Sequence, residues 1–347
     1  MRRPTPSRRG MLGGAAALLT GWVSGPGRGL ADEGGLQAAA ELAIAQASSG
    51  FLAWRDGETR IERYAAGWGP ERPREVASVA KSFVAVLVAM AAEDGALAGL
   101  DQPAAAFIPA WREDARAGIT LRHLMSMTSG LDDRGLALRN VAGDQFALNA
   151  AAPLRHPPGA RWAYNTAAYH LLFHILAVAT GETVEAFARR RLFGPLGMDH
   201  TRWITSPGTG ERGPVVNYYS AVSTARDLAR FGRLVLDGGR SEGGRLLGAD
   251  SLGALLVPSQ ALNPSYGLLW WLNSRPGKDA FGRGDSLRFP SAPSDTVAAL
   301  GAGGQMLLVV PSRRLVVVRQ GDPPPSPALA DELLAAVLRA SPGGGGV

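Results

Sequence analysis

The sequence predicts an α/β (α+β) domain in which a large, mostly helical segment separates two groups of strands. Strand-like runs stand near both ends of the 347-residue chain, and segments with helical periodicity fill the middle. The composition, 46% hydrophobic and 19% charged, is that of a globular protein. Apolar stretches end too soon for a multi-pass membrane protein. The length allows one large domain or two, and the order of elements favours one.

The first 31 residues predict a signal peptide of the twin-arginine type. Arg8 and Arg9 precede an apolar, Gly- and Ala-rich run, and "GLA" at 29–31 offers small residues for cleavage. We therefore expect export to the periplasm or the exterior. An uncleaved anchor is the alternative, but the run is short and glycine-rich for a stable span.

Removal of residues 1–31 would take away five arginines and no acid, which lowers the formal charge from +6 to +1. The basic character therefore gives no support for a nucleic-acid partner, and we expect no membrane partner once the signal is gone. The absence of cysteine excludes a disulfide scaffold, a thiol nucleophile and thiolate metal sites.

The elements follow in order along the chain. "LQAAAELAIAQASS" (36–49) has helical periodicity, and 51–67 contains two strand-like runs about an Asp56-Gly57 turn. From Ser78, "VAKSFVAVLVAMAAEDG" is apolar on nearly every side, as in a buried helix. We expect the sheet to use residues 50–75 and 266–322, and the part between 78 and 265 to be mostly helical.

The last third returns to strands. "GGQMLLVV" and "RLVVVRQ" are β-branched runs separated by "PSRR", which is typical of a hairpin. "PALADELLAAVLRA" predicts an amphipathic helix that ends the domain near residue 340, and 341–347 is expected to be a flexible tail.

The strongest chemical signal is the spacing of Ser78 and Lys81. Only two of the 36 basic residues are lysines, Lys81 and Lys278, and a lysine can lose its proton in a buried site where an arginine cannot. One helical turn brings the two side chains within reach, and unpaired amides at a helix start stabilise negative charge. A desolvated Lys81 could take the Ser78 proton. The alternative is that Ser78 only caps the helix and Lys81 reaches solvent.

A second candidate is Tyr164, in a Pro/Gly-led loop before the apolar helix of "PGARWAYNTAAYHLL". Its phenol could relay a proton between Lys81 and a leaving group, or it could be a packing residue.

Several motifs together resemble the penicillin-recognising serine hydrolases, that is, class C β-lactamases and their esterase, peptidase and amide-hydrolase relatives. The motifs are, in order, "SVAKSF", "TLRHLMSMTSGLDD", "PGARWAYNTAAYHLL", "AVSTARDLARFGRLVLDGG", "YGLLWW" and "GAGGQMLLVVPSRRLVVV", and the resemblance covers roughly residues 36–340. The resemblance implies a β-lactamase/transpeptidase-like fold, with an antiparallel sheet flanked by N- and C-terminal helices. It implies no metal and no cofactor.

By the same resemblance, Ser78 is acylated, Lys81 is the base and Tyr164 assists. The oxyanion hole would use the amides of Ser78 and, within one residue, Gln305. Two further residues of these motifs, Asn165 and Gly304, are expected at the substrate.

Two positions depart from the family pattern. Threonine stands at 166, where the Tyr-x-Asn motif has asparagine, and Ala302 stands where the third motif usually has Lys or His. That cation meets the substrate carboxylate in β-lactamases and cell-wall peptidases. "YNT" and "GxGGQ" are more similar to the branch with 6-aminohexanoate-dimer hydrolases and carboxylesterases.

Other signals are weaker. "GTGERG" (208–213) has glycine spacing like a nucleotide-binding turn, but we see no strand before it or helix after it and expect a loop. His170 and His174 have no adjacent glutamate or third ligand, which favours packing over a metal site. Trp270 and Trp271 could line a pocket or the core.

We therefore expect a secreted serine hydrolase that acts on a small-molecule ester or amide. The alternatives are a β-lactamase or DD-peptidase on the same fold, and a non-catalytic penicillin-binding-like module. The sequence does not give the oligomeric state.

Overall fold

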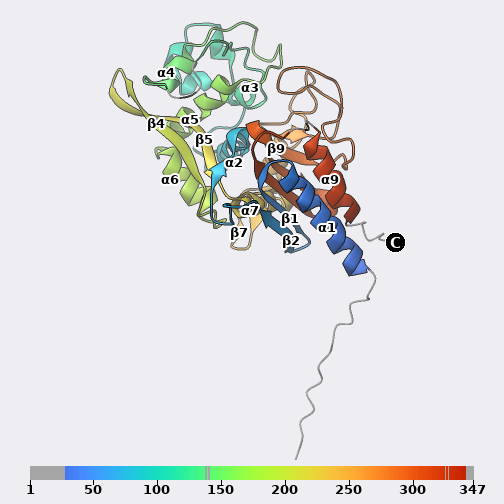
Figure 1. The fold of residues 1–347 in the computed structure, drawn as a ribbon. Helices are drawn as coiled ribbons and strands as arrows, with labels where there is room; N and C mark the ends of the chain where they lie inside the picture. Colours follow the sequence, from blue (N-terminus) through green and yellow to red (C-terminus); the bar gives the residue numbers. More distant parts are fainter. Residues whose placement is uncertain (1–27, 137–138, 140, 325, 327, 341–347) are drawn as a thin grey trace, which may run out of the picture.

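A six-stranded antiparallel sheet forms the centre of the molecule (Figure 1). The computed structural model describes residues 28–136, 139, 141–324, 326 and 328–340. The strand order is β2-β1-β11-β10-β9-β8. Bounds are Ser48–Arg55 (β1), Glu58–Tyr64 (β2), Trp271–Leu272 (β8), Val297–Gly301 (β9), Gln305–Val310 (β10) and Leu315–Gly321 (β11). The sheet thus joins the first strands of the chain to the last, as the sequence predicts.

Both predicted hairpins are present, and local backbone chemistry explains their turns. Between β1 and β2, Asp56 and Gly57 have φ of 49° and 102°. Positive φ at both central residues is the requirement of the tight hairpin turn that Asp-Gly favours. Between β10 and β11, Arg314 has φ of 45° at the corresponding corner.

Helices cover both faces of the sheet, and as a result every residue of β10 and β11 is buried. Helices α1 (Arg28–Ala45) and α9 (Leu329–Ala340) lie side by side on one face (Figure 1). On the other face, α7 (Ala225–Leu236) packs on β10 and β11, and Gly232 lets it approach closely. The predicted buried helix is α2 (Ala80–Glu93), in which the twelve consecutive residues from Ala80 to Ala91 are buried.

The segment between β2 and β8 holds most of the helices. Its elements are η1 (Ala77–Val79), α2, η2 (Ala104–Ala106), η3 (Pro109–Trp111), η4 (Ala115–Gly118), α3 (Leu121–Met125), α4 (Gln145–Ala150), α5 (Thr166–Thr180), α6 (Val184–Ala188), η5 (Arg189–Phe193), α7 and α8 (Ala249–Leu255). Short strands β6 (Arg240–Ser241) and β7 (Gly244–Arg245) form a hairpin after α7. Two further short helical turns, η6 (Ala302–Gly304) and η7 (Pro311–Arg313), connect the last strands.

One sequence expectation about this segment is wrong. Residues 208–213 do not form an isolated loop, because strand β4 (Arg202–Gly210) runs into them and β5 (Gly213–Ser223) leaves them. With β3 (Arg74–Glu75) these strands form a second sheet in the order β3-β5-β4. Proline and glycine in "SPGTGERG" hid a strand whose side chains alternate between exposed and half-buried along the hairpin.

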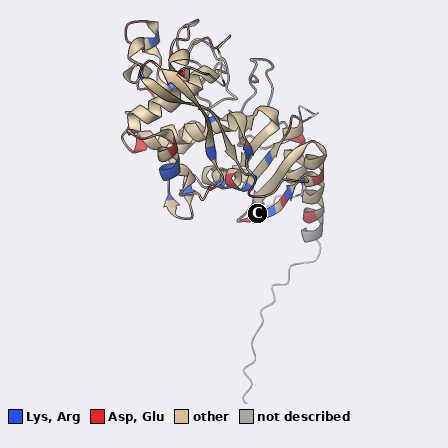
Figure 2. Cartoon of the chain, turned by 60° about the vertical axis from the view of Figure 1, so that its left-hand side comes forward, with Lys and Arg blue, Asp and Glu red and all other residues tan. Residues whose placement is uncertain are grey.

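The predicted signal peptide falls largely on residues 1–27, outside the described residues, and the cleavage point after Ala31 lies within α1. Within the described ranges no single helix has the length and apolar character to cross a membrane. Helix α5 and the following segment Val184–Phe193 reach that length and apolar character only together, and they are bent by 82° relative to each other. Basic and acidic residues are scattered over the helical part and the sheet part alike (Figure 2).

Candidate active site

Ser78 and Lys81 meet at the start of the buried helix α2. Ser78 lies in the 3-10 turn η1, and α2 begins two residues later, at Ala80. Ala77, just before it, has φ of 48°, a conformation that a non-glycine residue rarely adopts and that often marks functional sites. The Lys81 Nζ donates to Ser78 Oγ at 3.1 Å. The predicted pair is therefore in hydrogen-bond contact.

The surroundings of Lys81 favour its neutral form. The residue is 3% exposed, and no carboxylate of the described residues forms an ion pair with it. Burial lowers the pKa of Lys81 to about 7, and the Asp133 carboxylate opposes this shift. The nitrogen also lies 3.5 Å from Thr166 Oγ1 and over the rings of Tyr164 and Tyr169. A group poised near neutral pH suits a general base.

Tyr164 forms the opposite wall of the site. Its side chain hydrogen-bonds Ser78, which lowers its pKa, but burial dominates and raises the pKa of Tyr164 to about 12. The phenol therefore keeps its proton at neutral pH and can donate it. Its ring stacks on Trp271 at 5.9 Å, and Tyr266 meets it edge-on. Trp271 thus lines the site, whereas Trp270 is a core residue stacked on Phe231.

Asn165 holds the start of helix α5. Its Oδ1 accepts from the Ala168 amide at 2.7 Å, and its Nδ2 donates to the Leu131 carbonyl at 2.8 Å. Both ends of this side-chain amide are thus occupied by the fold. Of the two residues directly after Tyr164, it is Thr166 whose side chain approaches Lys81.

Asp133 is a site residue to which the sequence analysis gave no role. Its Oδ2 accepts from the Thr166 amide at 2.9 Å, at the N-terminus of α5, and its charge acts on Lys81. Asp133 is the last residue of the quoted segment "TLRHLMSMTSGLDD". A carboxylate there would have been a reasonable candidate for the unpaired amides of the helix that follows Tyr164.

The glycine-rich turn after β9 approaches the residues that precede Ser78 from the sheet. A Cβ built on Gly301 would lie 2.2 Å from the Val76 carbonyl oxygen and 3.2 Å from Ala77 Cβ. The backbone of Gly301 therefore packs directly on the residues that precede Ser78, and only glycine fits.

Gln305 and Gly304 lie on the far side of this turn. Gln305 pairs with Gly301 inside the β9–β10 ladder, one strand further from the edge, and its side chain exchanges hydrogen bonds with the Gly321 backbone. Gly304 has φ of 72°, and a Cβ there would lie 2.6 Å from Arg319 Nη1. Gln305 therefore makes its contacts within the sheet, and Gly304 lies against Arg319.

The amide that faces the open edge of β9 is that of Ala302. Strand β8 covers only Val297 and Ala298, and the Asn273 amide donates to the Thr296 carbonyl on that side. Because peptide groups alternate along a strand, Thr296 and every second residue after it face this edge. Gly301 is extended (φ −125°, ψ 154°), so the alternation reaches the Ala302 N–H.

The two histidines of α5 pack as predicted. His174 stacks on Phe146 with ring centroids 3.6 Å apart, and His170 Nε2 lies 3.4 Å from the Tyr219 carbonyl. Burial is the largest cause that lowers the pKa of His170, to about 3, so its ring is neutral.

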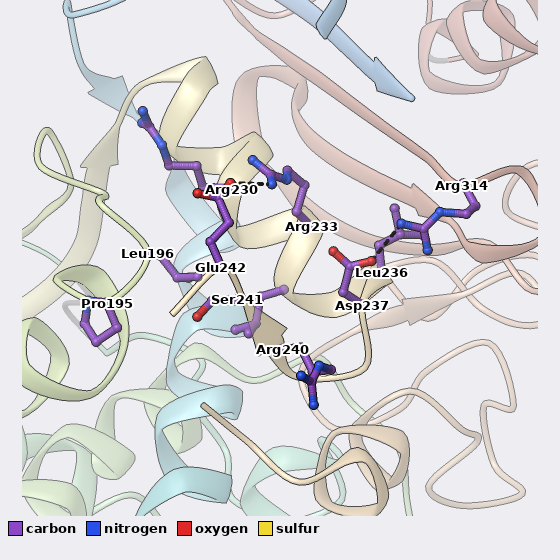
Figure 3. A pocket seen from close by; sticks show the side chains of 11 residues that line it. Pro195, Leu196, Arg230, Arg233, Leu236, Asp237, Arg240, Ser241, Glu242 and Arg314 are labelled. Carbon is purple, nitrogen blue, oxygen red and sulfur yellow. Dashed lines mark hydrogen bonds and ion pairs between the residues drawn. The ribbon is translucent and has the colours of Figure 1, made fainter. Parts of the chain in front are cut away.

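Two pockets have lining residues that do not include Ser78, Lys81 or Tyr164. One, of about 630 Å³ at the end of α7, is lined by four arginines, but Figure 3 shows their side chains pointing in different directions. Arg233 pairs with Glu242, and Arg314 pairs with Asp237. The other, of about 880 Å³, lies between α4, α5 and the tip of the β4–β5 hairpin. The contact between Ser78 and Lys81 thus lies outside both pockets.

Comparisons with known proteins agree on this fold. A family model described as beta-lactamase matches residues 37–339. The 6-aminohexanoate-dimer hydrolase of Paenarthrobacter ureafaciens is 28% identical over 57% of this chain and 54% of its own length. The chain spans about half the length, or less, of the curated relatives that it matches.

Solved structures show the same similarity of fold. A penicillin-binding protein from Bacillus halodurans has a TM-score of 0.63 at 20% identity and covers 88% of this chain and 98% of that one. EstCE1, described as a hydrolase with promiscuous acyltransferase activity, has a TM-score of 0.66 at 16% identity, over 90% of this chain and 99% of that one.

Proposed function

Because the chain belongs to the beta-lactamase family, we propose that it is a serine hydrolase in which Ser78 forms an acyl-enzyme with an ester or amide substrate. The observation that carries this proposal is the contact of Ser78 Oγ with a buried Lys81 at 3.1 Å. Burial brings the pKa of Lys81 to about 7, so a large fraction of the amine is neutral at physiological pH.

In the first step, neutral Lys81 takes the proton of Ser78 while Oγ attacks the substrate carbonyl. The carbonyl oxygen becomes an oxyanion, for which we assign the Ser78 and Ala302 amides as donors. Ala302 replaces the expected Gln305 because its N–H faces the open edge of β9. Such donors each contribute several kcal/mol to a transition state, about 2.7–4.

The leaving group then needs a proton. Tyr164 has a pKa of about 12 and contacts Ser78, so it can pass a proton from the Lys81 ammonium to the departing oxygen or nitrogen. Water next attacks the ester on Ser78, and the same groups act in reverse to release the acid and restore Ser78.

The substrate is best sought among neutral esters and short linear amides. Ala302 offers no cation to a substrate carboxylate, and an unpaired buried carboxylate is costly. The named activity of the Paenarthrobacter relative makes short amides part of the search. We expect nitrophenyl esters to be cleaved faster than cephalosporins or D-Ala-D-Ala peptides. Efficient cephalosporin turnover without esterase activity would instead assign a β-lactamase.

The test of the nucleophile is Ser78→Ala, with Ser82→Ala as its matched control. Ser82 lies on the same helix, and its hydroxyl donates to the Leu269 carbonyl at 2.8 Å, away from the chemistry. We expect Ser78→Ala to lose turnover and fluorophosphonate labelling by intact mass, and Ser82→Ala to keep both. Near wild-type turnover in the Ser78 variant would refute the assignment.

A second candidate is a penicillin-binding-like module that is acylated and then stalls. Thr166 and Ala302, which depart from the family pattern, favour it. Pre-steady-state kinetics separate the two functions, because a stalled module gives one burst of product per molecule and no steady state.

A further inference from the structure

Arg319 is a fully buried cation that the proposed chemistry does not use. It stands in β11, within the apolar run "LVVVRQ", and is 0% exposed. No described carboxylate forms an ion pair with it; the nearby Asp322 carboxylate pairs with Arg74. A buried charge without a counter-ion is costly unless its hydrogen bonds are satisfied.

Every N–H of the Arg319 guanidinium has an acceptor. Nε donates to Ser48 Oγ at 2.9 Å. Nη1 donates to the carbonyls of Gly303 and Gly304, both at 2.8 Å. Nη2 donates to the carbonyls of Gln46 at 2.9 Å and Asp322 at 2.8 Å. A guanidinium has five N–H donors in a fixed fork, and all five are engaged here.

These acceptors come from three separate parts of the chain. Gln46 and Ser48 join α1 to β1, Asp322 follows β11, and Gly303 and Gly304 form the turn after Ala302. Gly303 and Gly304 have φ of 77° and 72°, so the turn has the backbone that only glycine adopts readily. The Cβ that Gly304 lacks would collide with Nη1. The turn is therefore built around the guanidinium.

The front of the same turn faces the nucleophile. Gly301 packs on Val76 and Ala77, and Ala302 has the amide that we assign to the oxyanion. We propose that Arg319 is a positioning residue, which holds the turn 302–304 from behind so that the Ala302 amide points at the carbonyl attacked by Ser78. This inference rests on the proposed function, because it concerns the oxyanion donor of that reaction.

The number of donors explains why this position needs arginine. Lysine has a point charge with three donors, so Arg319→Lys would leave at least two of the five acceptors without a partner. Burial lowers the pKa of Arg319 to about 10, and the group therefore stays charged at neutral pH.

The experiment compares Arg319→Lys with the control Arg74→Gln. Arg74 pairs with the Asp322 side chain, whereas Arg319 donates to the carbonyls of the turn itself. For a nitrophenyl ester we expect Arg319→Lys to lower kcat by about 10²-fold with KM nearly unchanged, since a misplaced oxyanion donor weakens only the transition state. A boronic acid, which forms a tetrahedral adduct on serine, should lose affinity in parallel. Arg74→Gln should behave as wild type.

Hydrogen exchange supplies a readout that does not depend on activity. We expect the segment around residues 301–305 to exchange at least about tenfold faster in Arg319→Lys, because two strong hydrogen bonds are lost. Unchanged kcat in a folded Arg319→Lys protein, or unchanged exchange of that segment, would overturn the proposal. If wild type is never acylated at Ser78, the proposed function fails, while hydrogen exchange still decides whether Arg319 holds the turn.

Discussion

The two sides of the candidate site each contain a buried cation, and burial affects the two cations differently. Lys81 is 3% exposed and Arg319 is 0% exposed, and neither forms an ion pair with a described carboxylate. Lys81 has two hydroxyls within reach, whereas Arg319 has four carbonyls and a hydroxyl. Burial lowers both pKa values, to about 7 for Lys81 and about 10 for Arg319.

In the proposed reaction, the same desolvation makes Lys81 a base and leaves Arg319 a charged structural residue. Burial penalises the charged form of either group. Lys81 starts from an ordinary pKa of 10.5 with few acceptors, so it reaches the range where it can exchange protons. Arg319 starts higher and has a full set of acceptors, so it remains a cation. The sparse solvation of Lys81 is therefore part of its chemistry.

The largest expected effect comes from Lys81→Arg, which tests whether Lys81 has to lose its proton. Arginine keeps the charge but cannot act as a base at a workable pH. We expect acylation to fall by about 10²–10⁴-fold, nearly as far as in Lys81→Ala. In wild type, kcat/KM should rise with pH through a pKa near 7, because the neutral amine is the active form. Single-turnover acylation across pH measures both.

Substantial activity in the Lys81→Arg protein would show that Lys81, like Arg319, does not need to lose its proton. Lys81 would then act only through its charge, and Tyr164 would be the next candidate for the base.

A smaller effect is expected from Gly301→Ala, which tests whether the turn held by Arg319 contacts the nucleophile. The new Cβ would lie 2.2 Å from the Val76 carbonyl oxygen, so the backbone on one side has to move. A displacement of about 1 Å at a catalytic group costs on the order of 10² in rate. Steady-state kinetics of the folded variant give the value.

The matched control is Gly253→Ala in α8, where nothing lies within 4 Å of the added Cβ. Its activity should equal wild type, with a gain in stability of about 0.5–1 kcal/mol. Full activity in Gly301→Ala would separate the turn from the reaction.

The smallest effect is expected from Asp133→Asn. The amide oxygen can still accept from Thr166, but the charge that raises the pKa of Lys81 is lost. The pKa of Lys81 should therefore fall further, and the acidic limb of the kcat/KM profile should move to lower pH with less than about a tenfold change in its plateau.

Asp132→Asn is the control for this shift, since the Asp132 carboxylate pairs with Arg134 and Arg155 instead. A limb that moves equally in both variants would show that Asp133 has no specific action on Lys81.

The sequence predicted the parts of the site that local spacing determines. Ser78 and Lys81 were identified because one helical turn fixes their distance and because lysine is rare in this chain. The hairpins followed from Asp56-Gly57 and from two β-branched runs. The β4–β5 hairpin was missed because its strands contain proline and glycine, which do not favour strand conformation. The pairing between the two strands stabilises that conformation instead.

The remaining site residues depend on contacts between distant segments. Asp133 acts on α5, which begins 33 residues later, and no local pattern predicts that contact. The family resemblance pointed to Gln305, within one residue, as an oxyanion donor, whereas its pairing with Gly301 depends on the sheet register. The residue type of Arg319 did not indicate a special role, because arginine is common in this chain. The available clue was a charged residue inside a strand of β-branched residues.

The central sheet also sets the order in which the chain can fold. Strand β1 pairs with β11, and Arg319 reaches Ser48 across 271 residues. A nascent chain that has finished its helical middle still lacks the partner of β1 and the tie to the 303–304 turn. Contacts of such sequence separation carry a high loop-closure entropy and slow the rate-limiting step. Until the last strand leaves the ribosome, β1 has an unpaired edge, which exposes the nascent chain to aggregation.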